Sequence, residues 1–271
     1  MIKKTWLVAL LIASFLLIPA VKAEATSEST IVLGNVIGSS VTTLARGLIQ
    51  GKVRNFKDVI ECLGYGMVSG YGFYQAKKQV AAGRTFSGVL LANLSASVID
   101  NVTSGEGPLS YLGFTLPLVR IEIATPLAKK PVALISFSVS PRDAISLVMS
   151  LGKSDRASLR GGMLSFEADT PLEEGVRGWA YSIFPTVVSG KPDSVFGHEM
   201  VHVVQSLQLM AASPEPFLKD QRREYGKAKF LAFRGVRFQA LGLVNDFTLA
   251  KLQSYKGYWK EAEAYALVDT N

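Results

Sequence analysis

Histidine and cysteine are both scarce in this sequence, which has two histidines and one cysteine among 271 residues. The single cysteine, Cys62, excludes an internal disulfide and a metal site made of several thiolates from this chain. Because Cys62 lies between Ile60 and Leu63, we expect its thiol to be buried among helical side chains. Two histidines also exclude any site that needs three histidine ligands from one chain.

Both histidines occur in one short phrase, His198-Glu199-Met200-Val201-His202. On a helix, residues four positions apart share a face, so both imidazoles can point at the same metal ion. Glu199 would then lie beside a metal-bound water, where a general base is needed. The pattern predicts a zinc site, and the alternative is two unrelated histidines on a core helix.

The residues around this phrase predict a helix. Residues 192–194, Pro-Asp-Ser, are typical of a helix N-cap, and an apolar-rich run follows over 195–210. Two prolines shortly after the run end the helix. Gln205 follows His202 by three positions and lies near the same face. We expect Gln205 either to hydrogen-bond a metal-binding histidine or to be a polar residue at the helix edge.

The N-terminus has the three parts of a secretory signal peptide. Lys3 and Lys4 give a positive start, residues 6–17 are almost purely apolar, and residues 21–23 offer small side chains for cleavage. We therefore expect residues 1–23 to be removed and the mature protein to be secreted or periplasmic. The alternative is an N-terminal membrane anchor, for which the apolar run is short.

The rest of the chain has the pattern of an α+β protein. Residues 24–110 are rich in glycine and small apolar side chains, which predicts a helical N-terminal half packed on the rest, with helices at 56–80 and 86–102. A small mixed sheet with a short helix at 141–151 is expected next, before the motif helix and a C-terminal helix. The expected strands are 116–124, 132–139, 158–167 and 179–188. Residues 111–271 would then form a metal-binding domain.

Two further segments suggest partners. Residues 217–247 mix basic and aromatic side chains and are interpreted as an amphipathic helix with a solvated cationic side. The alternative is contact of residues 219–237 with an anionic envelope surface. In the segment 179–188, Pro185 suits an edge strand, against which an extended peptide could pair. Without the three lysines of residues 1–23 the net charge falls from +7 to about +4, which favours no nucleic-acid partner.

A catalytic zinc site needs three protein ligands and one open position, so a carboxylate must complete this one. The alanine-rich helix expected over 259–267 suits that task, because alanine lets helices approach closely. Glu261 and Glu263 on this helix differ by two positions, about 200° of rotation, so only one of them can face the metal.

The two helices together resemble the gluzincin metallopeptidases of the thermolysin and neprilysin type. In that family the third ligand is the first Glu of a Glu-x-x-Ala-Asp-like phrase on a later helix. By position Ala264 matches the family's Ala and Glu261 becomes the ligand, with Glu263 as the alternative. Tyr265 stands where the family often has Asp, so the carboxylate that orients a zinc histidine is missing there.

The motif is also similar to a phrase in a second group of proteins. Residues 198–205, HEMVHVVQ, resemble the HE-x-x-H-V-x-Q phrase of small, poorly characterised bacterial proteins classed as peptidases. Both resemblances cover only the two helices, about a quarter of the chain. They imply a zincin-like domain over 111–271.

The resemblance and the residues together predict an exported zinc-dependent metallopeptidase that acts on peptides or proteins. Zn²⁺ would be held by His198, His202 and Glu261, and Glu199 would move the proton of the attacking water to the leaving amine. Candidates for stabilising the oxyanion are an arginine, Tyr255, Tyr258 and Tyr265. The alternative is a non-catalytic cell-envelope metal-binding protein with a structural or vestigial site. Three ligands favour catalysis, because structural zinc is normally closed by four.

Overall fold

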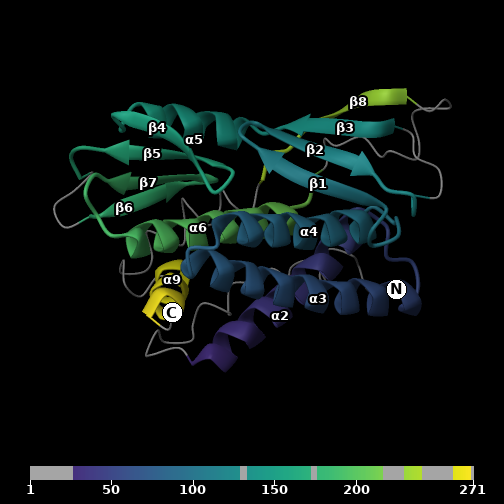
Figure 1. Ribbon diagram of the computed structural model, residues 1–271. Coiled ribbons are helices and arrows are strands. Elements are labelled where there is room, and N and C mark those ends of the chain that lie inside the picture. The colour runs from purple at the N-terminus through teal and green to yellow at the C-terminus, as the bar shows by residue number, and fades with distance from the viewer. Residues whose placement is uncertain (1–26, 129–132, 172–175, 216–228, 240–258, 270–271) are drawn as a thin grey trace.

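The computed structural model describes residues 27–128, 133–171, 176–215, 229–239 and 259–269, and the expected signal peptide lies outside them. The α+β class is confirmed (Figure 1). Helices come first, two small mixed sheets follow, and the chain then forms the motif helix and a C-terminal helix. The helices are α2 (Glu28–Ile49), α3 (Phe56–Ala81), α4 (Thr85–Thr103), α5 (Pro141–Leu151), α6 (Asp193–Ala212) and α9 (Trp259–Asp269). The strands are β1 (Tyr111–Leu116), β2 (Val119–Ala124), β3 (Ala133–Val139), β4 (Arg156–Arg160), β5 (Met163–Ala168), β6 (Gly178–Tyr181), β7 (Phe184–Val188) and β8 (Lys229–Val236).

Local capping explains where several helices begin. The Asn55 side chain accepts a hydrogen bond from the Asp58 backbone, and Asp58 accepts one from the Asn55 backbone, so α3 starts with a capping box. Ser140 accepts from the Asp143 backbone, and Pro141 occupies the first turn of α5. The helices expected at 56–80, 86–102 and 141–151 are therefore confirmed to within a residue or two.

The strands form two four-stranded sheets instead of the one sheet expected. Their orders are β1-β2-β3-β8 and β4-β5-β7-β6, and each sheet contains one parallel pair, β3 with β8 and β5 with β7. In Figure 1 the sheets lie side by side on the same side of α4 and α6. The first sheet packs on α4 through β1, and the second packs on α6 through β6 and β7.

Two segments expected as single strands, 158–167 and 179–188, are hairpins. The expected strand 116–124 is β2 together with the turn of the β1–β2 hairpin. Each hairpin turns through residues with positive φ: Leu118 at 69°, Gly161 and Gly162 at 57° and 81°, and Ser182 at 55°. Two-residue hairpin turns need such backbone angles. Only the pair Gly161-Gly162 makes a hairpin turn recognisable from the sequence. At Leu118 and Ser182 apolar residues continue on both sides of the turn, so the sequence resembles one continuous strand.

The amphipathic helix expected over 217–247 is wrong for Lys229–Val236, which form β8. This strand pairs in parallel with β3, and the Phe137 and Phe233 rings lie 5.2 Å apart across the pair. β-sheet pairing with a distant strand overrides a helical pattern that is only local. Residues 216–228 and 240–258 of this region lie outside the described residues.

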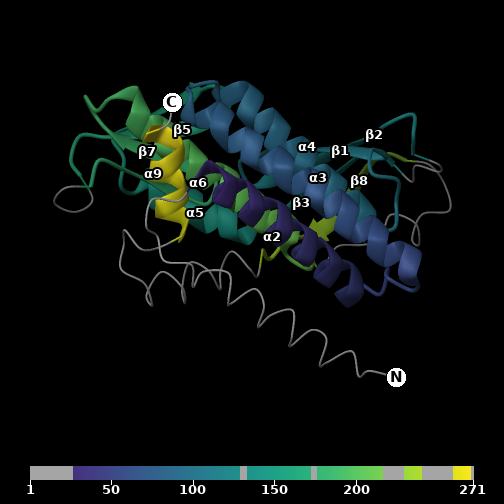
Figure 2. The same ribbon diagram turned by 90° about the horizontal axis from the view of Figure 1, so that it is seen from below.

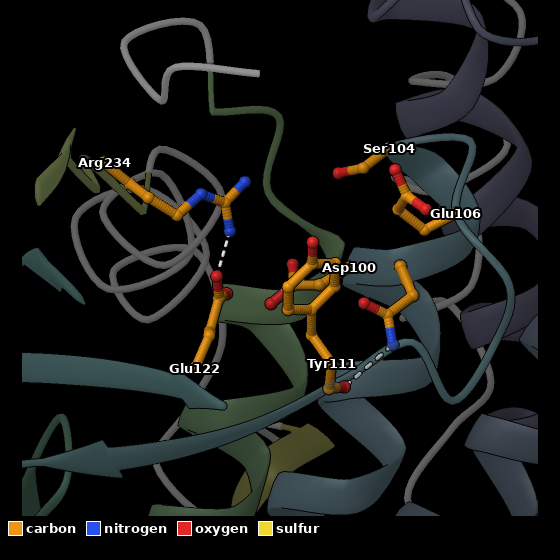
Figure 3. A pocket seen from close by; sticks show the side chains of 7 residues that line it. Asp100, Ser104, Glu106, Tyr111, Glu122 and Arg234 are labelled. Atoms are coloured by element: carbon orange, nitrogen blue, oxygen red, sulfur yellow. Dashed lines mark hydrogen bonds and ion pairs between the residues drawn. The ribbon is translucent and has the colours of Figure 1, made fainter. Parts of the chain in front are cut away.

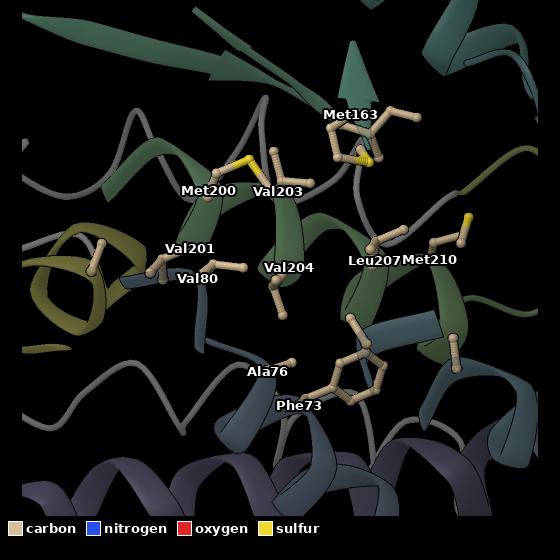
Figure 4. Close-up of a cluster of buried hydrophobic side chains, with 14 of the residues drawn as sticks. Phe73, Ala76, Val80, Met163, Met200, Val201, Val203, Val204, Leu207 and Met210 are labelled. Carbon is tan, nitrogen blue, oxygen red and sulfur yellow. The ribbon is translucent and has the colours of Figure 1, made fainter. Parts of the chain in front are cut away.

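Helix α6 runs through the middle of the core. It packs on α3 and α4, on α9 and on strands β6 and β7, so its apolar side chains are enclosed on several sides. Figure 4 shows Val204 of α6 beside Ala76 of α3, and Met200 and Val203 turned toward Met163 of β5. Full burial of each such side chain stabilises the fold by about 1.5–3 kcal/mol. A motif carried by α6 is consequently held by a helix most of whose residues are buried.

Helices α2 and α3 form a close pair on the side away from the sheets (Figures 1 and 2). A side chain at Gly70 would approach the Asn35 carbonyl oxygen to 2.4 Å, so glycine allows this contact. Cys62 is 3% exposed in this pair, as expected, and burial raises the pKa of its thiol to about 11. Helix α2 is long and apolar enough to cross a membrane, a criterion that a core helix also meets, and 44% of its most apolar window is buried.

Candidate metal centre

Three side chains that could hold a metal ion converge between α6 and α9. His198 and His202 lie one turn apart on α6, and Glu261 lies in the first turn of α9. The Nε2 atoms of the two histidines are 3.2 Å apart. Glu261 places Oε2 3.1 Å from Nε2 of His198 and Oε1 3.1 Å from Nε2 of His202. All three residues are buried or nearly so.

The spacing of these atoms suits a tetrahedral zinc ion. With metal–ligand bonds of about 2.0–2.1 Å, two ligand atoms of a tetrahedral site lie about 3.3 Å apart. The two imidazole nitrogens are 3.2 Å apart, close to that value, and each lies 3.1 Å from a different oxygen of the Glu261 carboxylate. Burial opposes the charge of Glu261, but hydrogen bonds with His198 and His202 outweigh it and lower the pKa of Glu261 to about 2. Two imidazoles and an ionised carboxylate are a donor set typical of zinc.

Glu199 lies beside this group and does not belong to it. Its side chain is 4% exposed, and Oε2 has no hydrogen-bond partner among the described residues. Burial raises the pKa of Glu199 to about 8, and the charge of Glu261 adds to the shift while His202 opposes it. A buried carboxyl oxygen without a hydrogen-bond partner lowers the stability of a fold. Such groups are found at functional sites, where they take part in the chemistry.

The edge strand β6 contacts Glu199 directly. A side chain at Gly178, the first residue of β6, would lie 3.0 Å from both Cγ and Oε1 of Glu199. β6 is the outer strand of its sheet, whereas β7, which contains Pro185, lies between β6 and β5. Pro185 therefore does not mark an edge strand. It is tolerated because the pairing of β7 with β5 begins only at Thr186.

Glu263, the alternative ligand, faces a different set of partners. Its carboxylate binds the Lys77 ammonium at 2.8 Å and accepts hydrogen bonds from Asn35 and Gln205. Burial opposes ionisation of Glu263, but these partners outweigh it and hold its pKa below the usual range. Gln205 also contacts His202, with Oε1 2.8 Å from Nδ1. Lys77 and Asn35 were not recognisable from the sequence, because nothing local links them to the motif.

One of the three tyrosine candidates lies at the site. The Tyr265 ring packs against the His198 imidazole, with ring centroids 4.5 Å apart. An aromatic ring thus occupies a place beside a histidine where the resemblance led us to look for a carboxylate. Tyr255 and Tyr258 lie outside the described residues.

A second polar cluster lies away from the histidines and holds the first sheet to the helices. Asp100 of α4 lies 2.7 Å from Arg46 of α2, 3.2 Å from Arg120 of β2 and 3.3 Å from Arg237 after β8. Asp100 also lines a small polar recess together with Glu122 and Arg234 (Figure 3). Burial raises the pKa of Asp100, but the arginines overcome this and hold it well below its usual range.

Two arginines of the segment 219–237 belong to this cluster. Arg234 forms an ion pair with Glu122, and Arg237 lies 2.9 Å from Glu122 with only 1% of its side chain exposed. These two side chains are thus turned into the protein, where they neutralise carboxylates. The basic residues at 219–228 lie outside the described residues.

No family model, curated protein or solved structure matches this chain. The function is therefore argued from the geometry of the His198, His202 and Glu261 group and its surroundings.

Proposed function

We propose that this chain is an exported zinc-dependent metallopeptidase that hydrolyses peptide bonds. The observation that carries the proposal is the convergence of His198, His202 and Glu261 at zinc-like spacing. Beside them lies a buried carboxyl oxygen of Glu199 that has no hydrogen-bond partner among the described residues. The described residues supply three ligands, the number of protein ligands that a catalytic zinc site uses.

The roles of the residues follow from their positions. His198 and His202 would bind the metal through Nε2 and Glu261 through its carboxylate. A bound zinc ion lowers the pKa of a coordinated water toward about 7 and polarises a carbonyl group. With the charge of a bound zinc ion beside it favouring its ionised form, Glu199 would accept the proton of the attacking water at Oε2 and deliver it to the leaving amine. The low-dielectric surroundings strengthen each of these interactions.

A peptide substrate is supported by the outer strand β6. Its first residue, Gly178, touches Glu199, and its outer edge has no paired strand among the described residues. An extended peptide that paired with this edge would pass close to the Glu199 carboxyl. Backbone pairing also suits an enzyme that acts on peptide bonds whatever their side chains.

Zinc binding itself is the first test. We expect one zinc per chain in the wild-type protein after reconstitution. At a zinc concentration that saturates the wild type, Glu261→Ala should bind little, because two histidines alone cannot complete the site. Glu263→Gln should still bind one, because Glu263 faces Lys77. Elemental analysis gives the stoichiometry, and a wild-type chain without zinc would contradict the proposal.

The contact between β6 and Glu199 gives a second expectation. The added carbon of Gly178→Ala would lie 3.0 Å from both the Glu199 side chain and the Thr186 backbone oxygen, so the Glu199 side chain must move by a few tenths of an ångström. We expect hydrolysis to fall about 10-fold, since misplacement by about 1 Å can cost 10²-fold. Zinc content should not change. Gly34→Ala is the matched control, because nothing lies within 4 Å of the added carbon. Equal activity in both variants would show that β6 does not position Glu199.

A further inference from the structure

Helix α9 contains the third metal-binding group but has few apolar anchors of its own. It is 11 residues long, and isolated helices shorter than about 12–15 residues are only marginally stable in water. It packs on α6, α3 and α2 (Figure 2). Among its side chains at 261–268, the buried apolar ones are Ala264 and Leu267. Alanine buries little apolar area, so the position of α9 depends on its polar contacts as well.

One carboxylate joins α9 to all three of these helices. Glu263 accepts hydrogen bonds from Asn35 of α2 at 2.6 Å and from Gln205 of α6 at 2.8 Å. Its two oxygens lie 2.9 and 2.8 Å from the ammonium group of Lys77 on α3. Lys77 is fully buried and also donates to Oδ1 of Asn35 at 2.7 Å. The Glu263 carboxylate is held in one place, because moving it would leave several buried polar groups without a partner.

The contacts of Glu263 control the rotation of α9 about its own axis. Glu261 and Glu263 are about 200° apart around the helix, and Glu261 faces the histidines of α6 while Glu263 faces Lys77. A side-chain tip lies about 5–6 Å from the helix axis, so a rotation of about 10° moves it by about 1 Å. Metal–ligand distances tolerate only about 0.2 Å. A contact that fixes the rotation of α9 at Glu263 therefore also fixes the position of the Glu261 carboxylate.

We propose that Lys77 and Asn35, through their contacts with Glu263, hold α9 at the rotation in which Glu261 reaches the two histidines. This inference rests on the proposed zinc site, of which Glu261 is the third ligand. Lys77, Asn35 and Glu263 are positioning residues, because none of them belongs to the group that could hold the metal. The helices α2 and α3, distant from the motif in sequence, thereby support the metal centre.

A double-mutant cycle on zinc affinity tests the role of Lys77. Lys77→Met should weaken zinc binding by about 10–100-fold, the range typical of losing a group that orients a metal ligand. Glu261→Ala binds zinc only weakly, through the two histidines. Adding Lys77→Met to Glu261→Ala should change nothing further, because no Glu261 carboxylate remains to be positioned. If Lys77→Met weakens zinc binding by the same factor in both backgrounds, its effect does not pass through Glu261 and the proposal is wrong.

Amide hydrogen exchange of the metal-free protein gives a second readout, which needs no zinc. We expect faster exchange in α9 of Lys77→Met and unchanged exchange in α6, because Lys77 ties α9 to a core that stays packed. Asn35→Ala removes the 2.6 Å hydrogen bond to Glu263 and should act in the same direction, so it serves for both measurements if Lys77→Met does not fold. Unchanged exchange in α9, or exchange that rises equally in α6, would contradict a role confined to α9.

Lys78→Met is the matched control. Lys78 is the next residue of α3 and pairs with Glu28 at 2.7 Å, but this pair is exposed, so neither zinc affinity nor α9 exchange should change. The results separate this inference from the zinc site. A wild type that binds no zinc, with α9 exchange that still depends on Lys77, would support the anchoring of α9 and overturn the metallopeptidase. A folded Lys77→Met protein with wild-type zinc affinity would overturn the positioning role alone.

Discussion

Glu199→Gln is expected to keep one zinc per chain and to lower peptide hydrolysis by about 10³-fold, within the 10²–10⁴-fold range typical of a lost general base. The substitution preserves side-chain shape, and Glu199 is not among the three groups that converge, so zinc should remain bound. Glutamine cannot take a proton from water at the position of Oε2, the atom without a partner among the described residues. Hydrolysis of a peptide library with parallel zinc analysis measures both effects.

Glu61→Gln is the control for this experiment, because Glu61 lies on the exposed face of α3 and pairs only weakly with Lys57 at 3.7 Å. It should behave as the wild type. If Glu199→Gln binds zinc and hydrolyses peptides at the wild-type rate, the catalytic proposal fails. The alternative, a non-catalytic cell-envelope protein with a structural metal site, would then be favoured.

The part of the site that the sequence could predict is the part that depends on helical spacing. His198, Glu199 and His202 are fixed relative to one another by a single helix, and a local pattern is enough to place them together. The starts of α3 and α5 are likewise local features, since Asn55 and Ser140 cap them. In each case the interactions that decide the structure join residues within a few positions.

Interactions between distant segments could not be predicted in this way. Spacing alone left Glu261 and Glu263 equivalent, and their environments differ because Lys77, 186 positions before Glu263, lies beside the latter. The hairpin turns at Leu118 and Ser182 and the parallel pairing of β8 with β3 also depend on tertiary contacts. A single sequence contains no direct record of such pairings.

The charge cluster around Asp100 shows the same limit and carries the largest expected effect on stability. Asp100→Asn should lower the free energy of unfolding by about 3–5 kcal/mol, because it removes the carboxylate paired with the buried Arg46 and leaves Arg120 and Arg237 to share Glu122 alone. Arg46 and Arg120 lie within 3.2 Å of this carboxylate, and the side chains of both are at most 2% exposed. Urea unfolding should give a lower midpoint, with Asp193→Asn as the control. Asp193 pairs with Arg160 at the surface, and such pairs contribute less than about 1 kcal/mol.

The effect of Asp100→Asn should also reach α6. The Arg46 guanidinium that pairs with Asp100 also donates to the Ala211 carbonyl oxygen, near the C-terminal end of α6, where a cation is favoured by the helix dipole. The cluster thus holds α6 at the end opposite to His198. Asp100→Asn molecules that remain folded should bind zinc normally, because the metal-binding groups contact none of these arginines within the described part of the chain. Loss of stability together with loss of zinc affinity would contradict this separation of the two clusters.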